Sequence, residues 1–203
     1  MQRALGFSIF KQRNQIKYVF ALLFQKRYSF LLLSKVPFHS EGVMHSARSI
    51  ANSILNIAHK AGKQLTNMQL QKLVYFAHGW HLALTGKPLL TDAVKAWNFG
   101  PVIPPLYNSL KKYGNGIVTE PIKRKDQDTD EVLIIQEPES DYVKQLLQRV
   151  WEIYGNMTGA QMSYLTHQPD TPWEFTWKKE KFSVISDKLI QDHFFSLKAK
   201  NNA

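Results

Sequence analysis

The sequence predicts a mainly α-helical domain with a small antiparallel β-hairpin or sheet, an α+β fold in which helices dominate. Three observations lead to this prediction. Apolar residues recur at helical spacing in several segments, two segments open with a capping box, and two short apolar runs flank a polar loop. With 203 residues and 44% apolar content, the chain is long enough to bury one hydrophobic core.

The net charge of +10 is distributed unevenly along the chain. Residues 1–43 hold seven Lys and Arg against one acid, whereas residues 44–203 hold 19 basic and 15 acidic residues. Because the second part is only mildly basic, we do not expect it to bind nucleic acid. We therefore predict a basic extension over 1–43 and one domain over 44–203.

The extension is interpreted as sequence upstream of a misassigned start, with a targeting peptide or a surface-binding arm as the alternative. Its two apolar runs, 18–24 and 30–33, are separated by a basic pair and lack the pattern of a secretory signal.

No run in the chain reaches the roughly 18 apolar residues of a membrane span. The chain has no cysteine, which excludes disulfides and thiolate metal sites and is compatible with the cytoplasm. We expect a cytoplasmic protein with no membrane partner.

The first two helices of the domain are well marked. Isoleucines at helical spacing predict a helix over 46–60. Thr66 and Gln69 form a capping box that opens a second helix over 66–85. This helix is apolar nearly all round, so we expect it at the centre of the fold. Lys72 is its one formal charge, and we expect the lysine to be exposed or ion-paired.

A β-like piece and a proline-rich turn come next. Residues 94–97 are typical of a strand, and the prolines and glycine of residues 98–105 predict a rigid irregular turn. Pro104 or Pro105 opens a third helix that runs to Tyr113. This turn therefore lies between two regular elements.

The polar segment that follows is predicted to be a hairpin. Residues 117–118 and 132–135 are expected as its strands, and the mixed-sign run 123–131 as its solvated tip.

The C-terminal part is predicted to be helical apart from one stiff loop. We expect helices over 141–154 and from the capping box at Thr158 to Leu165. Residues 167–173 are expected as a proline-stiffened loop, and Ser186 as the cap of a last helix.

The residues do not form a recognisable catalytic or metal site. The chain lacks the glycine-rich phosphate loops, the G-x-S-x-G turn and the H-E-x-x-H motif. His78 and His81 are three residues apart with no acid nearby, and we interpret them as core histidines. His167 and Asp170 lack a nucleophile, so a hydrolase is a minor alternative, and His167 is expected to hold a turn by a backbone hydrogen bond. We predict no catalytic residue, no cofactor and no metal.

Four segments together carry a family resemblance: residues 65–80, 96–102, 165–167 and 172–173. In this order and spacing they resemble the Panacea domain, the family of SocA-like antitoxins and phage-associated GepA-like proteins. The likeness covers roughly residues 44–180. The combination is specific, although each segment alone would be weak.

The resemblance implies a non-enzymatic antitoxin, often prophage-associated, that neutralises a toxin encoded nearby by direct protein–protein binding. The alternatives are an adaptor that delivers the toxin to a bacterial protease and a DNA-binding regulator of its own operon. Rigid aromatic residues in loops are suited to partner contact, and core packing is the equal alternative for each of them. The candidate toxin-binding residues are the motif positions of the two loops: Trp97, Phe99, Gly100, Pro101, Tyr107, His167, Pro172 and Trp173.

Overall fold

The computed structural model describes residues 43–199. Within this range the chain forms seven α-helices and two separate two-stranded antiparallel sheets. The predicted fold class, mainly helical with a small antiparallel β component, is confirmed. The predicted extension over 1–43 lies outside the described residues except for Val43.

The first two helices begin at the predicted caps. Helix α3 (Ala47–Lys60) starts after Ser46, whose hydroxyl accepts from the Ser49 N–H. Helix α4 (Asn67–Thr85) starts after Thr66 with a complete capping box. It ends at Gly86, which has a left-handed backbone with φ of 73°.

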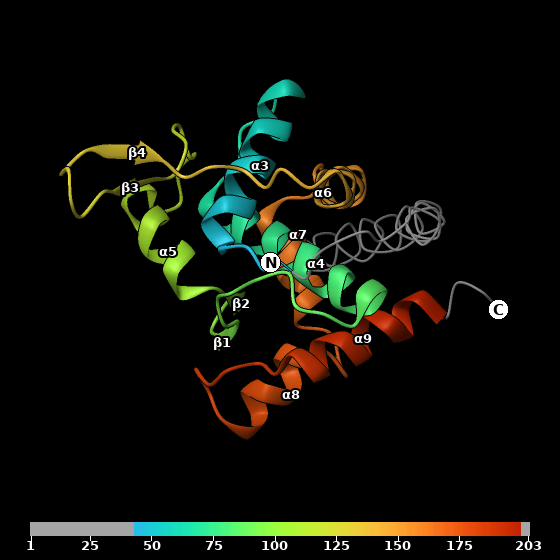
Figure 1. The fold of residues 1–203 in the computed structure, drawn as a ribbon. Helices are drawn as coiled ribbons and strands as arrows, with labels where there is room; N and C mark the ends of the chain where they lie inside the picture. The colour runs from blue at the N-terminus through green and yellow to red at the C-terminus, as the bar shows by residue number, and fades with distance from the viewer. Residues whose placement is uncertain (1–42, 200–203) are drawn as a thin grey trace, which may run out of the picture.

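Helix α4 is the centre of the fold, as predicted. Every residue from Leu70 to Ala83 is buried. Helices α3, α6, α7 and α9 pack around it, and α9 makes the most extensive contact (Figure 1). A helix that is covered on all sides needs apolar residues on all sides, which explains its sequence.

The proline-rich segment after α4 is more regular than predicted. Strands β1 (Lys95–Trp97) and β2 (Gly100–Val102) pair antiparallel, so residues 100–102 form a strand where an irregular turn was expected. Pro101 is tolerated because a two-stranded sheet leaves edges on which a residue needs no N–H donor. Helix α5 (Pro104–Leu110) follows, and a 3₁₀ turn extends it to Tyr113.

The second hairpin has a different first strand from the one predicted. Strand β4 (Val132–Ile134) pairs with β3 (Lys123–Lys125), which was expected to be part of the solvated tip. Ile117 instead makes an isolated bridge to Thr66. All residues of β3 and β4 are exposed, so no alternation of apolar and polar residues marks the true strand.

The C-terminal part contains one helix more than predicted. Helices α6 (Asp141–Tyr154) and α7 (Gly159–Thr166) match the prediction closely, and α9 (Asp187–Ala199) follows Ser186. Helix α8 (Pro172–Lys179) was missed because its first residues were interpreted as a loop. Pro172 stands at the first helical position, where its missing N–H costs nothing.

Candidate functional site

The candidate site is built around the β1–β2 hairpin. Trp97 and Gly100 pair directly at the end of the hairpin, and Asn98 and Phe99 form its tip. The Phe99 side chain is 69% exposed, which is unusual for a large aromatic residue. The hairpin therefore presents an aromatic group to the outside.

Side chains from α7, from its C-cap residue and from the start of α8 hold the backbone of this tip. The Trp173 indole Nε1 donates to the Trp97 carbonyl at 2.8 Å, and the Ser163 hydroxyl donates to the Phe99 carbonyl at 3.0 Å. The Nε2 of His167 lies 3.3 Å from the Asn98 carbonyl. Three consecutive carbonyl groups are thus contacted by side chains that lie more than 60 residues away.

Helix α4 holds the other strand of the hairpin. The Lys72 Nζ donates to the Pro101 carbonyl at 3.1 Å. The Gln71 side-chain oxygen accepts from the Ile103 N–H at 3.0 Å. Both bonds are buried, so they fix the hairpin against the central helix.

Lys72 is buried, and the prediction that it is exposed or ion-paired is wrong. The residue is 1% exposed and forms no ion pair with a carboxylate in the described part of the chain. Burial lowers the pKa of its amine from 10.5 to about 7. The sequence predicted that this face of α4 reaches water. The hairpin and α7, which are distant from it in the sequence, cover it instead.

Gly100 is required at its position for two reasons. Its φ of 104° is a conformation that side chains rarely adopt. A Cβ atom at this residue would lie 2.6 Å from the Lys72 Nζ and 2.7 Å from the Thr166 hydroxyl oxygen. The close approach of backbone to amine explains the glycine in the Phe99-Gly100-Pro101 sequence.

A cavity of about 600 Å³ lies beside the hairpin. Trp97, Phe99, Tyr107 and Phe182 give it aromatic walls, and the rings of Trp97 and Tyr107 meet edge to face at 5.0 Å. The start of α4 supplies polar residues to the same cavity. The remaining lining residues are Thr66, Asn67, Met68, Gln71, Lys72, Asn98, Val102, Lys111, Gly114, Asn115, Gly159 and Ala160. Its size and mixed lining are typical of a ligand or side-chain pocket.

The structure brings all eight predicted site residues to this hairpin but divides them into two groups. The exposed or half-buried Phe99, Trp97 and Tyr107 line the cavity. The other five are buried or half-buried, and of these His167 and Trp173 contact the hairpin backbone: Gly100, Pro101, His167, Pro172 and Trp173. Trp173 is 7% exposed, so of its two expected roles, core packing and outward contact, the structure shows core packing.

His167 has the backbone role expected of it. Its Nδ1 lies 2.6 Å from the Ser163 carbonyl, and its ring packs on Trp173 with centroids 3.7 Å apart. Asp170 is exposed and makes no hydrogen bond to His167. The two residues therefore do not form a base and its orienting acid.

His78 and His81 are buried, as predicted. The His78 Nε2 pairs with the Asp187 carboxylate at 3.0 Å and so joins α4 to the start of α9. The pKa of His81 is lowered to about 4, first by burial and then by the nearby His78 and His45. Among residues 43–199, no group of three or more His, Asp and Glu is placed to hold a metal ion.

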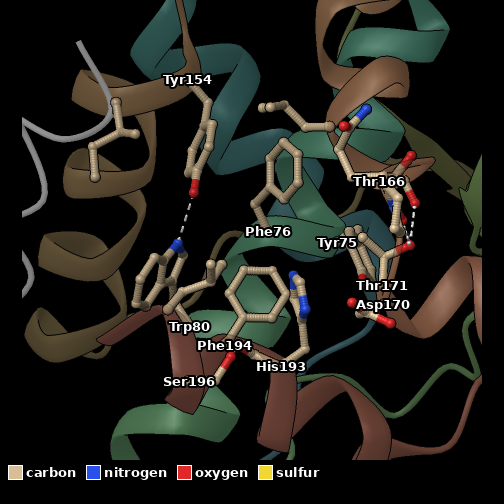
Figure 2. Close-up of a pocket in the computed structure, with 15 residues that line it drawn as sticks. Tyr75, Phe76, Trp80, Tyr154, Thr166, Asp170, Thr171, His193, Phe194 and Ser196 are labelled. Carbon is tan, nitrogen blue, oxygen red and sulfur yellow. Dashed lines mark hydrogen bonds between the residues drawn. The ribbon is translucent and has the colours of Figure 1, made fainter. Parts of the chain in front are cut away.

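A second cavity, of about 260 Å³, lies on the opposite half of α4 (Figure 2). Core aromatics form one part of its wall, with Phe76 stacked on Tyr154 at 4.3 Å and Trp80 donating to the Tyr154 hydroxyl at 3.1 Å. The Thr171 hydroxyl donates to the Thr166 carbonyl at its edge. This cavity follows the packing seam of α9, and neither Asp170 nor His193, which line it, is buried.

The sequence missed Asn67, Gln71, Lys72 and Phe182 as site residues. The two capping boxes located the starts of α4 and α7 correctly, but nothing in the sequence indicates that both starts face one cavity. In the described part of the chain, no helix is both long and apolar enough to cross a membrane.

Comparisons with known proteins agree with the arrangement of the motifs. The family described as "Antitoxin SocA-like, Panacea domain" matches residues 70–174. This range contains Lys72 on α4, the β1–β2 hairpin and the side chains that contact the hairpin backbone, those of Ser163, His167 and Trp173. The chain is 31% identical over 153 residues to Antitoxin SocA of Caulobacter vibrioides (strain NA1000 / CB15N), covering 73% of this chain and 81% of that protein. No solved structure gives a significant match. The chain belongs to the SocA-like antitoxin family with a Panacea domain.

Proposed function

We propose that this protein is an antitoxin that neutralises a cognate toxin by direct binding in the cytoplasm, without catalysing a reaction. The observation that carries the proposal is the similarity to Antitoxin SocA over most of both chains. The rigid, outward-facing hairpin supports a binding role, since exposed aromatic anchors commonly dominate protein interfaces.

The proposed contact surface is the hairpin tip together with the 600 Å³ cavity. Phe99 supplies an anchor that is already ordered, because the carbonyls around it are held by Ser163, His167 and Trp173. Ordering a loop in advance lowers the entropy cost of association. Trp97 and Tyr107 extend the surface into the cavity, while the buried motif residues maintain the scaffold.

The test is co-expression of the 203-residue chain with the product of the adjacent small open reading frame, scored by growth and by co-purification. Phe99→Ala should weaken the complex at least tenfold, because a central aromatic anchor typically contributes more than about 1.4 kcal/mol. Phe195→Ala is the matched control, since this phenylalanine is 56% exposed on α9 and lies outside the proposed surface.

Each outcome separates one alternative. Rescue with a stable complex supports neutralisation by binding. Rescue with loss of the toxin and no complex favours delivery to a protease, and salt-sensitive binding to the operon DNA without a toxin complex favours a regulator. Equal loss of binding in Phe99→Ala and Phe195→Ala would move the contact surface away from the hairpin.

A further inference from the structure

Two polar groups in the cavity beside the hairpin lack full hydrogen-bond partners. The Lys72 amine carries up to three donors, yet the structure gives it one acceptor, the Pro101 carbonyl. The side-chain oxygen of Asn67 is buried and has no hydrogen-bond partner among the described residues. Asn67 is 7% exposed, and leaving such a group unpaired costs about 1 to 3 kcal/mol. A bound ligand could supply both missing partners.

The cavity also receives the starts of two helices. In α4 and α7 the capping box satisfies the third N–H, that of Gln69 and of Gln161. The N–H groups of the residues that precede them form no hydrogen bond within residues 43–199, and all four residues line the cavity: Asn67, Met68, Gly159 and Ala160. Neither helix has an acid in its first turn, so the positive ends of both dipoles are uncompensated.

The charges around the cavity have one sign. Lys72 and Lys111 line it, and none of its described lining residues is Asp or Glu. A buried amine beside two helix starts favours an anion. The single buried amine carries at most one positive charge, which matches one negative charge better than the nearly two of a phosphate monoester.

Resting on the proposed function, we infer that the cavity binds a carboxylate of the partner protein, carried by an acidic side chain or by its C-terminus. The carboxylate accepts from the Lys72 amine and the free helix N–H groups. A neighbouring peptide N–H of the partner donates to the Asn67 oxygen. The aromatic walls hold the apolar part of the same segment.

The test uses the 203-residue chain and small peptide-like probes, read by the ¹H–¹⁵N shifts of the four helix-start amides. N-acetyl-L-phenylalanine carries a C-terminal carboxylate, and the α-amide of N-acetyl-L-glutamate carries a side-chain carboxylate. Their neutral matches are N-acetyl-L-phenylalaninamide and N-acetyl-L-glutamine amide. At least one acid should shift these amides with saturation at millimolar concentration, about −4 kcal/mol, while its neutral match should not. The stronger acid identifies the source of the carboxylate.

Variants at Ala160 test the site at an exposed residue, where a substitution is not expected to unfold the protein. Ala160 is exposed at the start of α7, where an acid is favourable for the helix. Ala160→Glu should fill the site with its own carboxylate and weaken probe binding at least tenfold, whereas the isosteric Ala160→Gln should bind nearly as the parent does. Lys72→Met should also weaken binding at least tenfold.

Three results would overturn the inference: no shift of the four amides, equal shifts with the neutral amides, or a response to inorganic phosphate alone. The probes do not involve the toxin, so the two proposals fail separately. Toxin neutralisation with an unresponsive cavity refutes the carboxylate site only. A responsive cavity in a chain that binds no toxin refutes the proposed function only.

Discussion

The two halves of α4 differ in how completely their side chains are packed and hydrogen-bonded. In the C-terminal half, Gly79 and Trp80 lie against α9, and the Phe194 ring packs into the space that the glycine leaves. In the N-terminal half, Lys72 and Asn67 are buried with hydrogen-bonding capacity left over, beside a cavity. The C-terminal half packs closely on Phe194 beside a cavity of about 260 Å³, whereas the N-terminal half leaves hydrogen-bonding capacity unused beside a cavity of about 600 Å³.

This difference indicates which half of α4 contributes less to the free energy of unfolding. Unpaired buried polar groups lower the free energy of unfolding, so proteins carry few of them. Lys72 and Asn67 lie next to the hairpin that presents Phe99, and in the other half of α4 the Nδ1 of His78 is also buried without a partner among the described residues. Local departures from good packing and pairing are expected at functional sites.

The largest effect is expected from Gly79→Ala at the packed half. A Cβ atom would lie 2.2 Å from the Phe194 ring, which is buried between Tyr75 and Trp80. The ring must move, and overpacking of this kind costs typically 1 to 3 kcal/mol. We expect the free energy of unfolding to fall by about 2 to 3 kcal/mol in urea denaturation.

A second substitution tests the cause of this loss. Phe194→Leu shortens the group that clashes, so Gly79→Ala should cost less in that background than in the parent. A measured coupling of about 1 kcal/mol or more between the two sites would support direct contact. A stabilising Gly79→Ala, as helix propensity alone predicts, would show that the seam is loosely packed.

In the N-terminal half of α4, the pH dependence of the free energy of unfolding reports the protonation of the buried Lys72 amine. The pKa of Lys72 is about 7 in the fold and 10.5 unperturbed, so between these values the unfolded chain binds more protons. The free energy of unfolding should therefore rise with pH in this window, by at most about 1.4 kcal/mol per pH unit. We expect a gain of about 2 kcal/mol between pH 7.5 and 9.5 that Lys72→Met abolishes.

Lys111→Met is the matched control for this experiment. Lys111 lines the same cavity but is exposed, so its removal should leave the slope unchanged. The measurements stop below the ionisation of Tyr75 and Tyr142, whose pKa values burial raises. If stability depends on pH equally in Lys72→Met and in the parent, the Lys72 amine is charged in the fold and stabilised by its surroundings. The two halves of α4 would then not differ in this respect.

Local chemistry made much of the fold predictable. The capping box at Thr66, the turn at Gly86 and the serine cap at Ser186 each act within a few residues, and the structure has all three where expected. Strand β3 and helix α8 were missed for the reverse reason. An exposed charged strand carries no apolar alternation, and Pro172 predicts a turn as readily as a helix start.

The site was predictable in its position but not in its construction. Motif residues in two loops indicated one surface, and the structure brings them together. Lys72 is buried by Gly100, Pro101 and Thr166, which are 28 or more residues away in the sequence, so helix periodicity could not reveal its burial. The role of the eight residues in toxin binding stays a prediction.

The smallest effect concerns the brace between α8 and the hairpin. Trp173→Phe removes the Nε1–H that donates to the Trp97 carbonyl at 2.8 Å. A lost hydrogen bond of this kind costs about 1 kcal/mol, and amide hydrogen exchange in the hairpin should become faster than in α4. Trp177→Phe is the control, because this ring stacks on Trp173 but its indole N–H makes no hydrogen bond in the described part of the chain. Faster hairpin exchange in Trp173→Phe alone would attribute the order of the Phe99 tip to the indole brace. Equal exchange in both variants would attribute it to α4, and hence to the half of that helix that carries the unpaired amine.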